Sequence, residues 1–123
     1  MFIARKGGMT FVLRTPTVGT DWGLPAFTWD GTWHLLDMSA IVPLAAKAVL
    51  VTISHNWNNT ALETFLRHPD DTCIGGSVLF KQPVAHQTIS RTILLPVKNA
   101  TIAYQQWNGT GQYFNWQVLG WFL

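Results

Sequence analysis

The segment 114–123 (FNWQVLGWFL) constrains the fold more than any other part of the chain. Read at a period of two, its residues fall into two sets. One set is Phe114, Trp116, Val118, Gly120 and Phe122. The other set is Tyr113, Asn115, Gln117, Leu119 and Trp121. Alternation of aromatic and β-branched residues is typical of a strand with one face against a core. No polar residue follows, so we expect this strand inside a sheet or with its edge covered by a neighbouring subunit.

Seven further segments have strand character and are separated by Gly, Pro and Asn. They are 10–14, 32–38, 47–56, 60–67, 77–81, 86–97 and 99–105. Segment 60–67 also fits a helix face, and we assign it as a strand because its neighbours are strands. Pro43 limits segment 39–47 to a short helical or turn-like stretch. This spacing predicts an all-β fold, an antiparallel β-sandwich or jelly roll of about eight short strands.

The length of 123 residues fits a single domain. Arg5, Lys6 and the Gly7-Gly8 pair form a charged joint, so we expect residues 1–9 to be an N-terminal arm that packs on a neighbour. Residues 10–123 then form the β-sandwich domain. Within it, the many Gly and Pro residues of segment 15–31 predict a long irregular loop.

Charged residues make up only 11% of the chain, against roughly 25% in a typical soluble domain. Such a surface favours a subunit of a larger assembly. The net charge of +2 is too small for a nucleic-acid-binding stripe. Apolar runs are too short for a membrane span or a signal peptide, so we expect the protein to be made and retained in a cytoplasm.

Residues that carry chemistry are sparse, and we expect no enzyme, metal or cofactor. The single cysteine, Cys73, forms no intrachain disulfide and is interpreted as a structural thiol. The four histidines lack zinc-site spacing, and the pair Asp70-Asp71 is interpreted as a solvated turn. Nucleophile-elbow, phosphate-loop and dinucleotide motifs do not occur. The two catalytic carboxylates of a glycosidase can be far apart in the sequence and adjacent in the fold, so their spacing along the chain does not test for such a pair.

Seven tryptophans are the strongest functional lead, and four of them are binding candidates: Trp22, Trp57, Trp107 and Trp121. Three of these lie in predicted loops beside Gly or Asn, and Trp121 lies on the non-core face of the final strand. Exposed tryptophans anchor protein interfaces, and they also stack on the apolar faces of sugars. We favour protein contact and keep sugar binding as the alternative.

The stretch 33–50 (WHLLDMSAIVPLAAKAVL), with ATIAY at 100–104 and QVLGW at 117–121, resembles a β-sandwich module of tailed-bacteriophage virion proteins. The resemblance covers residues 32–54 and 99–122. It implies a sandwich used in fibres, spikes or decorations of the particle, and it brings no catalytic residues. Within this block, Asp37 and Ser39 are predicted to hydrogen-bond backbone groups at a strand-to-turn junction, and Pro43 to stiffen the turn.

Together these features predict a non-enzymatic virion structural protein, an oligomeric capsid decoration or cement protein. Its expected partners are copies of itself, with a trimer as the first expectation, and the major capsid protein or other virion proteins. It would be located in the virion after assembly in the host cytoplasm. The alternative is a glycan-binding receptor-recognition module of a tail fibre or head spike, with a host surface glycan as its partner.

Overall fold

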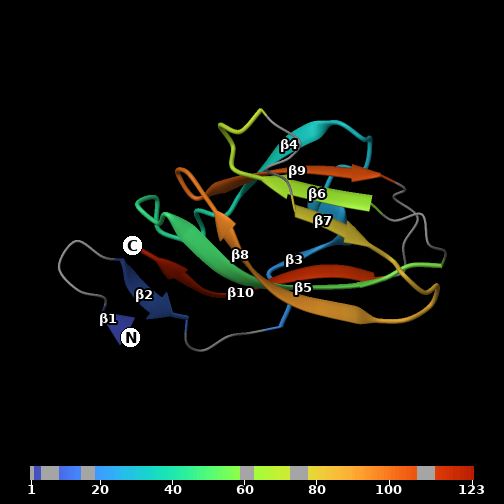
Figure 1. Ribbon diagram of the computed structural model, residues 1–123, viewed down its shortest axis with the longest axis horizontal. Coiled ribbons are helices and arrows are strands. Elements are labelled where there is room, and N and C mark those ends of the chain that lie inside the picture. Colours follow the sequence, from blue (N-terminus) through green and yellow to red (C-terminus); the bar gives the residue numbers. More distant parts are fainter. Residues whose placement is uncertain (1, 4–8, 15–18, 59–62, 73–77, 108–112) are drawn as a thin grey trace.

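The computed structural model describes residues 2–3, 9–14, 19–58, 63–72, 78–107 and 113–123. Within these ranges the chain is almost entirely β, with ten strands in two antiparallel sheets that face each other (Figure 1). Eight of the ten strands have four residues or more. The predicted all-β sandwich of about eight strands is therefore confirmed.

The first sheet has the strand order β1-β2-β10-β5-β8, and β3 also pairs with β10. Its strands are β1 (Phe2–Ile3), β2 (Thr10–Leu13), β3 (Trp22–Gly23), β5 (Ala48–Asn56), β8 (Ile89–Pro96) and β10 (Tyr113–Phe122). The final strand β10 thus lies inside the sheet, between β5 on one side and β2 and β3 on the other. Its backbone is paired within the chain, so it gives no reason to invoke a covering subunit.

The second sheet has the order β4-β9-β6-β7. Its strands are β4 (Trp33–Asp37), β9 (Thr101–Trp107), β6 (Glu63–Arg67) and β7 (Val78–Lys81). The ambiguous segment 60–67 is a strand over the residues described, and 60–62 lie outside them. The predicted loop 15–31 contains β3 and one helical turn, η1 (Leu24–Ala26).

The core lies between the sheets, where alternate residues of each strand meet. Val49, Val51 and Ile53 alternate along β5, whose segment the sequence predicts as a strand, and all three are fully buried. Opposite them lie the buried residues of the second sheet, which include Leu66, Ile102 and Tyr104. Burying one such aliphatic side chain stabilises the fold by about 1.5–3 kcal/mol.

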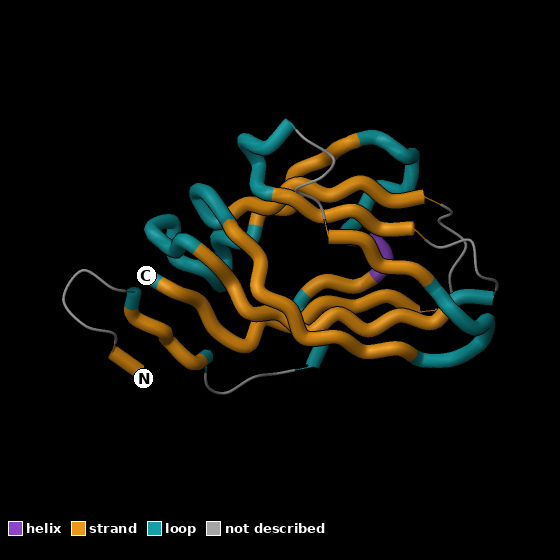
Figure 2. The backbone as a smooth tube through the Cα atoms, in the orientation of Figure 1, coloured by secondary structure: helices purple, strands orange, loops and turns teal. Residues whose placement is uncertain are grey.

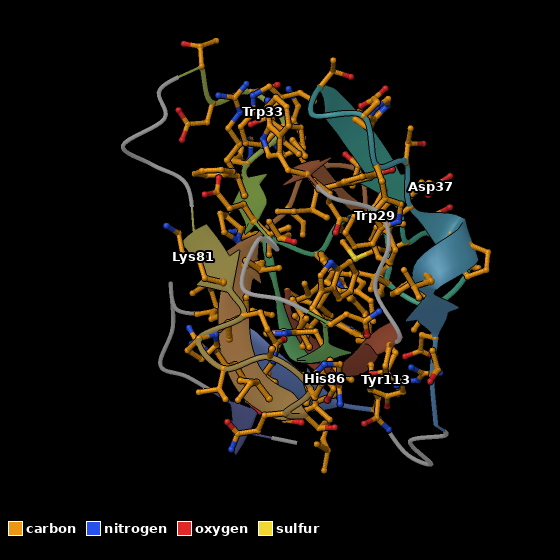
Figure 3. The ribbon with its side chains drawn as sticks, turned by 90° about the vertical axis from the view of Figure 1, so that its right-hand side faces the viewer. Trp29, Trp33, Asp37, Lys81, His86 and Tyr113 are labelled. Atoms are coloured by element: carbon orange, nitrogen blue, oxygen red, sulfur yellow. The ribbon has the colours of Figure 1, made fainter. Side chains whose placement is uncertain are left out.

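Aromatic side chains fill one end of this core. Phe27 packs edge-on against Phe114 and Tyr104, with ring centroids 5.1 and 5.3 Å apart. Trp29 lies 5.0 Å from Trp57 and 5.1 Å from Phe114. Figure 3 views this end and shows Trp29 between the two sheets. Each such pair adds about 0.5–1.5 kcal/mol beyond area burial.

The opposite end carries both chain termini. Phe2 pairs with Phe11 and Ile3 with Thr10, so the predicted N-terminal arm begins as an edge strand of the domain's own sheet. Figures 1 and 2 show β1 and β2 beyond the strands of the second sheet, beside the C-terminus. The first sheet is therefore longer than the second at this end.

Candidate functional site

The four candidate tryptophans occupy different environments. Trp57 has 0% of its surface exposed and belongs to the aromatic core. Its prediction as a surface-binding residue is therefore wrong, because Trp57 continues the inward alternation of Ile53 and His55 one residue past β5 and joins the core. Trp22 and Trp121 are half-buried and pack against the core. Only Trp107 among the four is an exposed side chain, at 47%.

The inward position of Trp121 results from a β-bulge in β10. The register with β5 shifts between Val118 and Gly120, so Leu119 is an extra residue. Because side chains alternate with a period of two, one extra residue exchanges the faces of everything that follows. Trp121 consequently pairs with the core residue Val49, and Phe122 turns outward. The predicted assignment of Phe122 to the core face and Trp121 to the other face is corrected by this bulge.

The bulge gives the outer face of the first sheet an apolar half. One row across the strands contains Leu13, Gly120, Leu50 and Leu94, and the next contains Phe11, Phe122, Ala48 and Pro96. Leu13 is 54% exposed and Leu94 53%. The rings of Phe11 and Phe122 lie 4.9 Å apart and continue the patch toward the termini.

The other half of this face is polar and uncharged. Thr52 and Thr92 share a hydroxyl hydrogen bond of 2.9 Å, and Ser54 and Ser90 share one of 2.7 Å. Asn56 donates to the Thr88 hydroxyl at 3.1 Å and continues this ladder. None of the outward residues described on β2, β10, β5 and β8 carries a charge at neutral pH.

The outer face of the second sheet is different, because it carries charged side chains and aromatic rings. The Arg67 guanidinium lies 3.7 Å from the centre of the Trp33 ring, a cation–π contact. The Lys81 ammonium lies 3.7 Å from the Glu63 carboxylate. Figure 3 shows Trp33 on this sheet and Tyr113 at the opposite side of the sandwich.

Trp107 packs on Gly31. A Cβ built on Gly31 would lie 2.4–2.6 Å from three atoms of the indole ring, so only glycine leaves room for it. Gly31 also has φ of +74°, a conformation that favours glycine. Its N–H donates to the Gln106 carbonyl at 2.9 Å, and its carbonyl accepts from the Gln105 side chain at 2.7 Å.

A polar cluster flanks this glycine. The Asp30 carboxylate accepts from the Thr32 N–H at 2.9 Å and the Thr32 hydroxyl at 2.8 Å, and lies 2.8 Å from His34 Nε2. These contacts, the His34 hydrogen bond first, lower the pKa of Asp30 to about 2. The cluster therefore holds an ionised carboxylate across the usual pH range, and it lies on the side of His34, whose ring packs 5.6 Å from that of Tyr104.

The predicted turn residues lie at the end of β4. Asp37 accepts a hydrogen bond from the Ser39 N–H at 2.9 Å, and the Ser39 hydrogen bonds lower the pKa of that carboxyl. The Pro43 carbonyl accepts a hydrogen bond from the Ala46 N–H at 3.0 Å.

Two further residues were considered for chemistry. The Asp70 carboxylate forms an ion pair with the Lys98 ammonium at 2.7 Å, and Cys73 lies outside the described residues.

Over the ranges described, the side chains form no pocket and no group of three or more potential metal ligands. The same part of the chain contains no helix long and apolar enough to cross a membrane. The candidate sites are therefore flat faces of the sandwich.

Sequence reasoning missed Gly31, Trp33, Phe122 and Leu94 as surface candidates. Gly31 and Trp107 are far apart in sequence and meet only through the pairing of β4 with β9. Phe122 was assigned inward because strict alternation gives no signal for a bulge. No protein-family model and no curated protein matches this sequence.

Proposed function

We propose that the protein is a non-enzymatic structural protein of a bacteriophage virion, an oligomeric decoration or cement protein on the capsid surface. The observation that carries this proposal is the outer face of the first sheet, which is charge-free and apolar over half its length. Monomeric proteins rarely expose a large contiguous apolar patch without using it in an interface.

The position of the phage-like segments supports the proposal. Segment 32–54 supplies β4 and β5, and segment 99–122 supplies β9 and β10. β4 pairs with β9 in one sheet, and β5 pairs with β10 in the other. The resemblance therefore lies in strand pairs that build both sheets, and it includes β5 and β10, the two central strands of the four that carry the apolar half.

The absence of charge on the outward residues of the first sheet favours a second copy of the chain as the partner of this face. In a two-fold contact the same patch faces itself, so any charge on it would meet a like charge. This face carries none in its described rows, and burying its leucines and phenylalanines gives a favourable hydrophobic contribution. The polar ladder beside the patch would form the hydrated rim. This contact gives a dimer, whereas the trimer expected from the sequence would need a head-to-tail contact between two different surfaces. Contact with capsid proteins belongs to the same proposal.

Self-association is tested by sedimentation velocity across a range of protein concentrations. Leu94→Lys places a charge in the patch, and Leu35→Lys is its matched control, since Leu35 is 62% exposed on the other sheet. We expect the wild type and Leu35→Lys to associate and Leu94→Lys to remain monomeric. A wild-type protein that stays monomeric at all concentrations would contradict self-association through this face.

The virion role needs its own measurement. Mass spectrometry of purified particles should find the protein in many copies, as expected for a decoration subunit. Such a subunit binds only the assembled shell, so particles that lack it should disassemble at a lower temperature. A few copies per particle, or none, would count against the decoration role.

The second candidate is a glycan-binding receptor-recognition module of a tail fibre or head spike. The specific observation in its favour is the exposed Trp107 ring, which lies over Gly31 and pairs with Glu63 of the neighbouring strand. Its location on the second sheet leaves the charge-free face available for assembly, so the two candidates do not compete for one surface.

A further inference from the structure

We infer that the exposed Trp107 ring, with the Glu63 carboxylate and the Lys81 ammonium in the same row, forms a platform for one neutral pyranose unit of a glycan. This inference rests on the second candidate function and assigns residues and a ligand class to it. It is independent of self-association through the first sheet.

Strand register places a charged pair beside the ring. Glu63 pairs with Trp107 of β9 on one side and with Lys81 of β7 on the other. Directly opposed residues of antiparallel strands have Cβ atoms about 4.5–5.5 Å apart. Glu63 and Trp107 both alternate with buried neighbours, Thr64 and Gln106, so both point outward. Ring, carboxylate and ammonium thus form one row on the surface.

The ring is held in place before any ligand arrives. Its Cε3, Cζ3 and Cη2 atoms rest where a side chain on Gly31 would be, and two hydrogen bonds fix that glycine from β9. The indole is therefore supported from beneath, while 47% of the side chain is exposed to solvent. A preorganised surface loses little conformational entropy on binding.

The chemistry around the ring suits a sugar. One face of a pyranose is lined with C–H bonds and stacks on an indole, while hydroxyls project around the rim. The Glu63 carboxylate accepts hydrogen bonds, and the Lys81 ammonium donates them.

Charge selects the class of sugar. The charged groups in the row of the ring are the Glu63 carboxylate and the Lys81 ammonium, which lie 3.7 Å apart and offset each other. An anionic sugar would find no unpaired positive charge in this row and would meet the Glu63 carboxylate, whereas a neutral sugar needs no counter-ion. Arg67 covers one face of the Trp33 ring at 3.7 Å, so Trp107 offers the open stacking surface. A single stacked unit implies weak affinity, with Kd on the order of 1 mM, which several copies on one particle would raise through avidity.

Saturation-transfer NMR on the full chain tests the platform. The probes are the methyl β-glycosides of galactose, glucose and N-acetylglucosamine, with N-acetylneuraminic acid as the anionic probe. We expect saturation transfer to ring C–H protons of at least one neutral probe. Trp107→Ala should weaken binding at least ten-fold and Glu63→Gln about three-fold, while Leu35→Ala on the same sheet face should leave it unchanged.

Trp107→Phe keeps an aromatic ring and should retain part of the binding, which separates a lost platform from a lost fold. Transfer to none of the neutral probes, preference for the anionic sugar, or unchanged binding in Trp107→Ala would each overturn the inference. Sedimentation of the same samples keeps the two candidate functions separate. If the protein is monomeric and binds a sugar, self-association is contradicted and the sugar platform is not. If it is oligomeric and binds none of the probes, the sugar platform is contradicted and self-association is not.

Discussion

Arg14 and Asp21 form an ion pair at the point where β10 changes face, with Arg14 Nη1 2.5 Å from Asp21 Oδ2. The same carboxylate oxygen accepts from the Val118 N–H at 2.8 Å, and the Arg14 N–H donates to the Leu119 carbonyl at 2.9 Å. The pair therefore holds both sides of the bulge. By doing so it fixes which of the last side chains face the core and which face solvent.

Asp21→Ala should destabilise the fold strongly. The Asp21 side chain is 4% exposed and Arg14 16%, so removing the carboxylate leaves a buried guanidinium without its counter-ion and the Val118 N–H without an acceptor. Breaking one side of a buried ion pair costs about 3–5 kcal/mol. Urea unfolding followed by circular dichroism measures the free energy of unfolding.

Asp70→Ala is the matched control for that variant. Asp70 pairs with Lys98 at 2.7 Å, but both side chains are more than half exposed. Solvent screens such pairs, so stability should change little. Equal losses in the two variants would show that the Arg14–Asp21 pair has no special role.

Strand positions were predictable from the sequence because each half-buried strand repeats its apolar residues at a period of two. Val49, Val51 and Ile53 follow that rule and are buried, and β8 ends at Pro96 as expected for an edge strand. The faces of Trp121 and Phe122 were not predictable, because Leu119 has no property that marks it as a bulge residue. Its position depends on Asp21, which is 97 residues away from Val118.

The surface platform was only partly predictable for a related reason. Trp107 is a candidate from composition alone, but its support by Gly31 requires β4 to pair with β9. Trp57 illustrates the opposite error. It lies among Asn residues, which predict a turn, yet packing against Trp29 and Phe114 determines its position. Local composition does not report these long-range contacts.

Gly120→Ala should destabilise the pairing of β2 with β10. A Cβ at Gly120 would lie 2.5 Å from the Val12 carbonyl oxygen and 2.7 Å from the Phe11 ring. Backbone must move to relieve that overlap, at a cost of about 1–3 kcal/mol. Gly19→Ala is the control, because nothing lies within 4 Å of its added Cβ. Thermal unfolding should show a lower Tm for Gly120→Ala alone, and equal Tm values would contradict the close approach of β2.

Trp57→Ala should lower the free energy of unfolding more than Trp107→Ala does, although the sequence predicts both tryptophans as surface-binding residues. Removing the fully buried Trp57 ring leaves a cavity in the aromatic core and should cost about 3–5 kcal/mol. Removing the exposed Trp107 ring should cost less than about 1 kcal/mol. Guanidinium unfolding monitored by circular dichroism compares the two. A larger loss for Trp107→Ala would contradict the assignment of Trp57 to the core.

Stability should fall as the pH drops below about 6.5, the ordinary pKa of histidine, because of His55. This side chain is fully buried, and its Nδ1 lies 2.7 Å from the Gln82 side-chain oxygen. Gln82 Nε2 donates to the Val84 and Gln87 carbonyls, so its oxygen is the acceptor and His55 Nδ1 carries the proton. Nε2 is then an unprotonated atom, buried with no partner among the described residues.

Protonating Nε2 would place a charged N–H in the core, and burial accordingly lowers the pKa of His55 below its ordinary value. Gln82 opposes this shift and Arg91 adds to it. With the folded pKa below the unfolded one, the unfolded chain binds more protons. The stabilising contribution is therefore complete above the unfolded pKa and is lost as the pH falls toward the folded pKa. His55→Gln removes the titrating group, so its free energy of unfolding should vary less between pH 7 and pH 5 than that of the wild type. Urea titrations at several pH values in this range measure both slopes, and identical slopes would show that His55 does not cause the pH dependence.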